Sequence, residues 1–206
     1  TIAEQLKLFE AEGLEVTIVD FAGGARALQA VVGGSADVVS GAFEHNINMQ
    51  AKGQRMRAFV VQGRAPQIVF AVSTKTMPNY KTVADLKGKK IGVSAPGSST
   101  NIMANFVLAK AGLKPSDVSF VGVGDAQGAV AALRAGQIDA ISNLDPVITM
   151  LMRSNDIQII SDTRDVAEAD KVFGGPMPAG TLYAPVSFIN KNPDTVQALT
   201  NAIVRA

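Results

Sequence analysis

The chain of 206 residues is 47% hydrophobic and 18% charged, which predicts a soluble globular fold with room for one large domain or two small ones. Its 19 Lys and Arg residues and 18 Asp and Glu residues leave a formal net charge of +1, so charge does not favour a nucleic-acid or membrane-surface partner. With no cysteine and one histidine, the sequence excludes disulfides, thiol catalysis and multi-histidine metal sites, and we expect no metal or cofactor.

The sequence contains no membrane-spanning or targeting segment. No run of 18 apolar residues could cross a bilayer, and no basic start with an apolar region behind it forms a signal peptide. We therefore expect that any export signal has been removed from this chain. The lack of cysteine adds weak support for an oxidising compartment such as the periplasm.

The first third of the chain predicts helices and strands in alternation. Ile2, Leu6 and Phe9 fall on one helical face, and Gly13 is placed to end that helix. A turn of small residues at 23–25 then opens a short helix that Gly34 can end in a left-handed conformation. In chain order, the other expected elements here are strands at 14–19 and 37–40, a helix at 44–52, and strands at 56–61 and 68–73.

Residues 123–143 repeat the layout of residues 21–41 without a gap. Identical pairs in the two copies are Ala27/Ala129, Ala30/Ala132, Gly34/Gly136, Asp37/Asp139 and Ser40/Ser142. Each copy has a turn, a helix whose first N–H groups lack intrahelical partners, and a short strand, at 37–40 or at 139–142. Such helix starts attract anions, although one copy alone would be an ordinary helix-to-strand unit. The repetition predicts two similar lobes.

A second candidate anion site follows the strand expected at residues 91–94. Ser98, Ser99 and Thr100 are favoured helix N-caps, so their hydroxyls and backbone N–H groups would converge there. The apolar face of the helix that follows is expected to comprise Ile102, Phe106, Val107 and Ala109. The stretch matches neither a Walker loop nor GxGxxG, so no nucleotide is expected.

The rest of the chain continues the alternation. The expected elements are a strand at 118–123, a helix at 147–153, strands at 157–161 and 181–189, and a helix that begins at 192–194 and runs to the end. Residues 162–178 are mostly polar or rich in Gly and Pro, and no element is predicted there. Because Pro185 cannot donate a ladder hydrogen bond, the strand at 181–189 is expected at a sheet edge or a crossing between lobes.

Three stretches of sequence together carry a family resemblance. They are FEAEGLEVTIVDFAGGARALQAVVGGSADVVSGA at 9–42, DLKGKKIGVSAPGSST at 85–100 and ALRAGQIDAISNLDP at 132–146. In this order, across nearly the whole chain, they resemble the periplasmic solute-binding proteins of ABC importers. The resemblance is to the nitrate/sulfonate/taurine type, which includes the thiamine-precursor binders. Each stretch has modest specificity, but the ordered set is strong.

This resemblance implies an α/β fold of two lobes, the periplasmic-binding-protein-like fold of type II. Each lobe would be a mixed sheet flanked by helices, with the ligand cleft between the lobes. We expect residues 1–71 plus 185–206 in one lobe and 72–184 in the other, with crossings near 72–73 and 183–184. Family members are longer at both ends, so the first lobe is expected to be truncated.

The resemblance also implies a set of ligand-binding residues at turns and strand ends. From the first lobe these are Gly23, Gly24, Ala25, Arg26, Gly41, Ala42 and His45, and from the second lobe Ser98, Ser99, Thr100, Asn143 and Asp145. Arg26 would either pair with a carboxylate or sulfonate or be solvated. His45 would either bond the ligand or be a capped or surface histidine. Phe43 and Tyr183 are expected in the core rather than stacked on a ligand.

The function implied is capture of a small polar or anionic organic solute (a sulfonate, carboxylate or pyrimidine-like compound) by lobe closure. We also expect the protein to deliver this solute to an ABC permease in the membrane. It would act outside the cytoplasm, as a monomer, and would not catalyse a reaction. Two alternatives stay open. One is an enzyme of thiamine-pyrimidine synthesis on the same fold, which the lack of cysteine disfavours. The other is the effector-binding domain of a transcription regulator.

Overall fold

The computed structural model describes residues 1–21 and 23–206, and they form two compact units. Unit 1 contains Thr1–Phe21, Arg26–Gly63 and Pro178–Ala206. Unit 2 contains residues 23–25 and Arg64–Met177. Apart from residues 23–25, the chain changes unit at 63/64 and 177/178, whereas we expected crossings near 72–73 and 183–184. Both expected crossings fall in strands of the structure. Each of these strands is hydrogen-bonded to a neighbouring strand on both sides within one sheet, so the chain does not leave its unit there.

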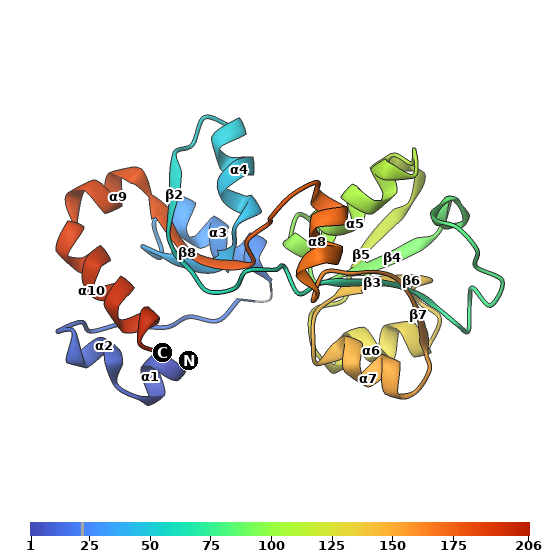
Figure 1. Ribbon diagram of the computed structural model, residues 1–206, viewed down its shortest axis with the longest axis horizontal. Helices are drawn as coiled ribbons and strands as arrows, with labels where there is room; N and C mark the ends of the chain where they lie inside the picture. Colours follow the sequence, from blue (N-terminus) through green and yellow to red (C-terminus); the bar gives the residue numbers. More distant parts are fainter. Residues whose placement is uncertain (22) are drawn as a thin grey trace. The chain divides into compact units, whose positions relative to one another are not determined.

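Unit 2 is built on a five-stranded mixed sheet in the order β5-β4-β6-β3-β7 (Figure 1). Its strands are β3 (Val69–Ser73), β4 (Lys90–Val93), β5 (Ser119–Gly122), β6 (Ala140–Asn143) and β7 (Ile157–Asp162). Strand β4 is parallel to β5 and β6, while β3 is antiparallel to β6 and β7. Its helices are α5 (Ser99–Lys110), α6 (Gln127–Arg134), α7 (Val147–Arg153) and α8 (Val166–Phe173), with 3-10 turns at Val83–Leu86 and Pro115–Asp117.

Helices cover both faces of this sheet, as the two cores of unit 2 show. Phe70 and Val72 of β3 pack in one cluster with side chains of α5 and α8. Val69 and Ala71, which point to the other face, pack with side chains of α6 and α7. Figure 1 shows the same pairs of helices on opposite sides of the sheet. A strand buried on both faces reads as a continuous apolar run, which is why its sequence predicted it well.

Unit 1 contains a smaller antiparallel sheet in the order β1-β8-β2. Its strands are β1 (Val39–Ala42), β2 (Met56–Val61) and β8 (Gly180–Pro185). Its helices are α1 (Ile2–Gln5), α2 (Leu8–Ala11), most of α3 (Gly24–Val32), α4 (Glu44–Ala51), α9 (Val186–Lys191) and α10 (Pro193–Val204). One small core joins Val31, Val39 and Tyr183, and another joins Ala3, Phe9 and Ala202.

The helix expected at 1–12 is divided into two short helices, and the strand expected at 14–19 was wrong. Lys7 has φ 55, a left-handed conformation that separates α1 from α2. Of the expected apolar face, Phe9 is buried, but Ile2 and Leu6 are each 61% exposed. Residues 14–19 alternate as a strand should, yet the structure assigns them no strand. A period-2 pattern alone cannot supply the neighbouring strand that a ladder needs.

Three further predictions need correction, all in the second half of the chain. Residues 162–178 contain the helix α8, for which Asp165 accepts a hydrogen bond from Glu168 N–H as the N-cap. The expected strand at 181–189 ends at Pro185, where α9 begins. Strand β8 lies between β1 and β2 rather than at the sheet edge. A central place is possible because Pro185 is the last residue of the strand, so the other residues keep the backbone N–H groups that the ladder needs.

The buried face of α5 is shifted from the expected one. Its buried apolar residues are Met103, Ala104, Val107 and Leu108. Phe106 is 43% exposed and meets Phe173 of α8 edge-on. No helix in the described part of the chain has both the length and the apolar character needed to cross a bilayer.

Candidate functional site

Three hydroxyl groups form a closed triangle where β4 turns into α5. The Oγ atoms of Ser94 and Ser98 are 2.8 Å apart, and Thr100 Oγ1 is 2.9 Å from each of them. Thr100 Oγ1 also accepts a hydrogen bond from Ser94 N–H, and Ser98 Oγ donates to Ala95 O. These bonds fix the path of the loop before the first turn of α5.

The triangle changes how the predicted site residues Ser98 and Thr100 are understood. Ser98 is 1% exposed and Thr100 is fully buried, and Ser98 makes no side-chain capping bond to α5. Their hydroxyls hold one another and the loop. Ser99 is only partly buried, so among these three its hydroxyl is the accessible one.

Asn101 is a polar residue at this helix start that the sequence did not single out. It is 8% exposed, and its Oδ1 accepts a hydrogen bond from Gly97 N–H at 2.9 Å. Its Nδ2 is buried and has no hydrogen-bond partner among the described residues. A buried amide without a partner is uncommon in native proteins, and such groups occur at functional sites.

The glycine turn before α3 lies against this same loop. Gly23 has φ 99, and a Cβ added there would lie 3.3 Å from Ala95 Cβ. The structure therefore brings together two stretches that the sequence proposed separately, the turn at 23–25 and the loop that leads to Ser99. Gly24 and Ala25 are partly buried at the start of α3, and Arg26 is exposed.

In unit 1, the end of β1 meets Tyr183 of β8. A Cβ added at Gly41 would lie 3.3 Å from the Tyr183 hydroxyl, so the absence of a side chain makes room for the phenol. His45 is 2% exposed, and its Nδ1 is 2.9 Å from the Tyr183 hydroxyl. The predicted site residue His45 is therefore a core residue rather than a surface one, while Ala42 is partly buried beside it.

Glu44, the first residue of α4, is a buried ionisable group in unit 1. It is 8% exposed, and its Oε1 has no hydrogen-bond partner among the described residues. Burial raises the pKa of its carboxyl from 4.5 to about 7, against a smaller lowering by a backbone hydrogen bond. Burial, and then the nearby charge of Glu44, also raise the pKa of Tyr183. The sequence reasoning passed over Glu44, although it directly precedes His45.

Asn143 and Asp145 at the end of β6 already have partners within unit 2. Asn143 is fully buried and donates from Nδ2 to Gly124 O. Asp145 Oδ1 accepts hydrogen bonds from Thr149 N–H and Oγ1–H, which, with Arg164, hold the pKa of its carboxyl below its usual range. Both residues therefore anchor the turn into α7.

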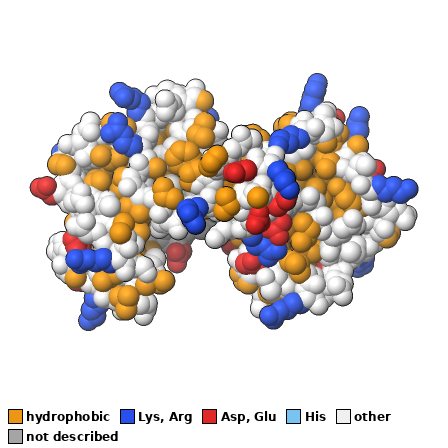
Figure 2. All heavy atoms as spheres, in the orientation of Figure 1, with side chains coloured by type: hydrophobic (Ala, Val, Ile, Leu, Met, Phe, Trp, Pro, Cys, Tyr) orange, Lys and Arg blue, Asp and Glu red, His pale blue; other side chains and the backbone are white. Residues whose placement is uncertain are grey.

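The described residues offer no side-chain cluster for a metal ion. No group of three or more His, Cys, Asp or Glu side chains in residues 1–21 and 23–206 could hold a metal ion. Figure 2 shows basic and acidic side chains interspersed on the face that it displays.

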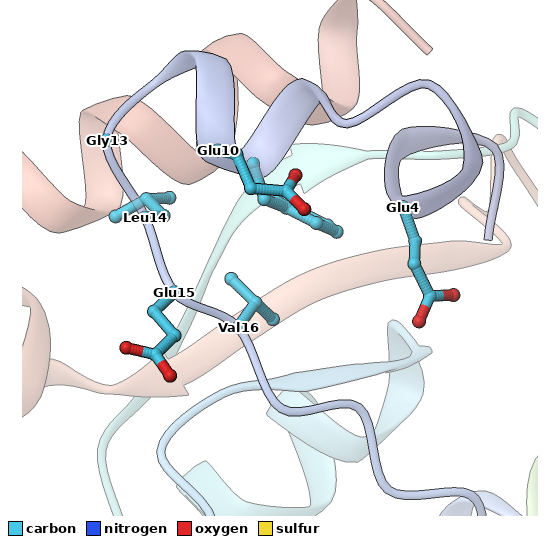
Figure 3. Close-up of a pocket in the computed structure, with 7 residues that line it drawn as sticks. Glu4, Glu10, Gly13, Leu14, Glu15 and Val16 are labelled. Atoms are coloured by element: carbon cyan, nitrogen blue, oxygen red, sulfur yellow. The ribbon is translucent and has the colours of Figure 1, made fainter.

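A pocket of about 420 Å³ lies elsewhere in unit 1 (Figure 3). Phe9, Leu14 and Val16 give it an apolar part. Glu4 of α1, Glu10 of α2 and Glu15 of the following segment also line it. Three carboxylates would repel an organic anion, so this pocket does not fit the expected solute.

A family model and a curated relative both match the whole length of this chain. A family model described as NMT1/THI5 like matches residues 1–206. A Brucella abortus protein with the provisional name of a binding protein is 31% identical, and the match covers 100% of this chain and 60% of that protein. The chain thus spans three-fifths of the length of this curated relative.

Solved structures also match this chain closely. One from Bordetella bronchiseptica RB50 is 67% identical with a TM-score of 0.97, and the match covers 99% of this chain and 64% of that one. The alkanesulfonate-binding protein SsuA from Xanthomonas axonopodis pv. citri, solved bound to MOPS, is 25% identical with a TM-score of 0.75. That match covers 99% of this chain and 67% of that one.

Proposed function

Because the chain belongs to the NMT1/THI5-like family, we propose that it is the solute-binding part of an ABC importer and captures a small organic anion, most simply a sulfonate. The observation that carries this proposal is the match of 99% of the chain to a protein whose name states that it binds alkanesulfonates. The mixed α/β fold is that of the periplasmic binding proteins, which fits the proposal.

The start of α5 is the proposed binding point for the anionic group. Backbone N–H groups of the first helical turn lack intrahelical partners and favour negative charge. Ser99 supplies an accessible hydroxyl, and Asn101 Nδ2 is a buried donor that a ligand oxygen can satisfy. Ser98 and Thr100 hold the loop in shape for this contact.

The other residues predicted for the site are proposed either to contact the solute or to hold the contacting residues in place. Gly23, Gly24 and Ala25 bring the backbone near the Ser94–Ala95 turn, and the exposed Arg26 can pair with a sulfonate or carboxylate. Residues proposed to support contact positions rather than to touch the solute are Asn143, Asp145 and His45. Gly41 and Ala42 are proposed as backbone neighbours of the solute.

We propose binding without turnover, release to a membrane permease and a location outside the cytoplasm, as a monomer. The names of the relatives support a binding role. A solute that binds the folded state alone, present at 100 times its dissociation constant, raises the free energy of unfolding by about 2.7 kcal/mol.

The test is a thermal-shift and calorimetric screen of this protein with alkanesulfonates, aromatic and aliphatic carboxylates, nitrate and pyrimidines. At least one sulfonate or carboxylate is expected to stabilise it and to be recovered unchanged after incubation. The proposal is contradicted if none of these compounds binds, or if the compound that binds is chemically converted.

A further inference from the structure

Hydrogen bonds within the fold do not account for both oxygens of the buried Glu44 carboxyl. One backbone hydrogen bond reaches the carboxyl, and Oε1 is left without a partner in the described chain. Leaving such an oxygen buried and unpaired opposes folding, so it is retained where something outside the fold satisfies it.

The neighbours of Glu44 do not explain it as an ion pair. The charged or titratable groups that face it are Tyr183 of β8 and, next to that phenol, His45 of α4. The Tyr183 hydroxyl lies 2.9 Å from His45 Nδ1 and is bonded there. No ion pair joins a Lys or Arg side chain to Glu44 within residues 1–21 and 23–206.

The position of Glu44 suggests what the missing partner is. It comes two positions after Ala42, the last residue of β1, and the proposed function makes the backbone of Gly41 and Ala42 neighbours of the solute. In its carboxylate form Glu44 can only accept hydrogen bonds, so its unpartnered oxygen calls for a donor on the ligand.

We propose that Glu44 is a specificity-determining residue whose Oε1 accepts a hydrogen bond from the solute, so that the protein prefers organic anions that also carry an N–H or O–H donor. The inference rests on the proposed function and deepens it. A solute that presents only acceptors leaves Oε1 buried without a partner, and sites built this way discriminate strongly against the analogue that lacks the donor.

The experiment uses matched probes that differ in a donor: propane-1-sulfonate against 2-aminoethanesulfonate, and benzoate against 4-aminobenzoate. Their affinities are measured by calorimetry at pH 8, above the pKa of Glu44, with the wild type, Glu44→Leu, Glu44→Gln and the control Glu168→Gln. Glu168 is an exposed carboxylate of α8 that pairs with Lys171, so its change to an amide matches Glu44→Gln in chemistry.

We expect the donor-bearing member of at least one pair to bind the wild type and Glu168→Gln at least tenfold more tightly than its partner. Glu44→Leu is expected to lose this preference and to retain affinity for the donor-free member. In Glu44→Gln the preference for the amine is expected to fall at least threefold, because a carboxylate accepts from an ammonium group more strongly than an amide does.

The outcomes distinguish failure of the role proposed for Glu44 from failure of the proposed function. Binding of both members with equal affinity to the wild type overturns the role of Glu44 and leaves the proposed function standing. A preference that survives in Glu44→Leu or, if that variant does not fold, is unchanged in Glu44→Gln also overturns it. If no probe binds the wild type, the proposed function itself fails for these solutes, and the inference fails with it.

Discussion

Glu44 makes the stability of unit 1 depend on pH. Its pKa is about 7 in the folded protein and 4.5 in the unfolded reference, so the folded state holds a proton that the unfolded chain releases between these values. Each unit of difference corresponds to about 1.4 kcal/mol, so the free energy of unfolding should fall by about 3 kcal/mol as pH rises from 4.5 to 7. Above pH 7 the contribution no longer changes.

The measurement is urea unfolding of the ligand-free wild type and Glu44→Gln at pH 5 and pH 8. The glutamine variant cannot titrate here, so its stability should fall less than that of the wild type across this range. Equal changes in the two proteins would show that the Glu44 carboxyl titrates normally and is not desolvated as the structure indicates.

Tyr183 offers a second prediction at the level of one atom. Tyr183→Phe removes the hydroxyl 2.9 Å from His45 Nδ1 but keeps the buried ring. Loss of this buried hydrogen bond should lower the free energy of unfolding by about 1–3 kcal/mol. The matched control is Tyr80→Phe, which alters the chain's other tyrosine, a partly exposed one in unit 2, and should change stability by less than about 0.5 kcal/mol. Similar effects of the two substitutions, measured by urea unfolding, would contradict this role for Tyr183.

Among secondary-structure elements, the loop before α5 contains both residues that hold the loop in shape and a residue that we propose contacts the solute. Thr100→Val removes the acceptor for Ser94 N–H and one corner of the hydroxyl triangle. It should lower the free energy of unfolding by about 1–3 kcal/mol. Ser99→Ala, whose hydroxyl is partly exposed, should change it by less than about 0.5 kcal/mol and weaken binding of a sulfonate. Chemical denaturation with calorimetry tests both, and the reverse pattern would refute the assignment.

The same elements show how far sequence reasoning reaches. Strand β3 was predicted well because both its faces are buried and its sequence is continuously apolar. Helix α8 was missed because its end signals, Asp165 and Gly174, lie in a stretch whose composition resembles a loop. The pattern at 14–19 gave a false strand, since alternation cannot reveal whether a pairing strand exists.

For the candidate site, the sequence singled out residues of the loop before α5 but did not predict the contacts that they make with one another. Residue types that cap helices led to Ser98 and Thr100, but their mutual hydrogen bonds depend on loop geometry that spacing does not encode. Glu44 was overlooked because a glutamate at a helix start is usually solvated, and its burial comes from packing that the sequence does not display.

For the whole molecule, the two units differ in how the chain builds them. Unit 1 combines three separate segments around two small apolar clusters. Unit 2 is one continuous segment, Arg64–Met177, apart from residues 23–25, and has a larger apolar core on each face of its sheet. A domain that can fold alone is typically one continuous stretch of chain with its own apolar core, here present on both faces of the sheet.

We therefore expect a fragment of residues 64–177 to fold without the rest of the chain. Its circular dichroism should show mixed helix and strand, and urea should unfold it in one cooperative transition. Omitting residues 23–25 uncovers the contact of Gly23 with Ala95, which is small beside the two cores. The full chain, measured in parallel, should lose the structure of unit 1 at lower urea than that of unit 2. A fragment that lacks a cooperative transition would mean that unit 2 depends on unit 1 for its stability, and that the two units unfold together.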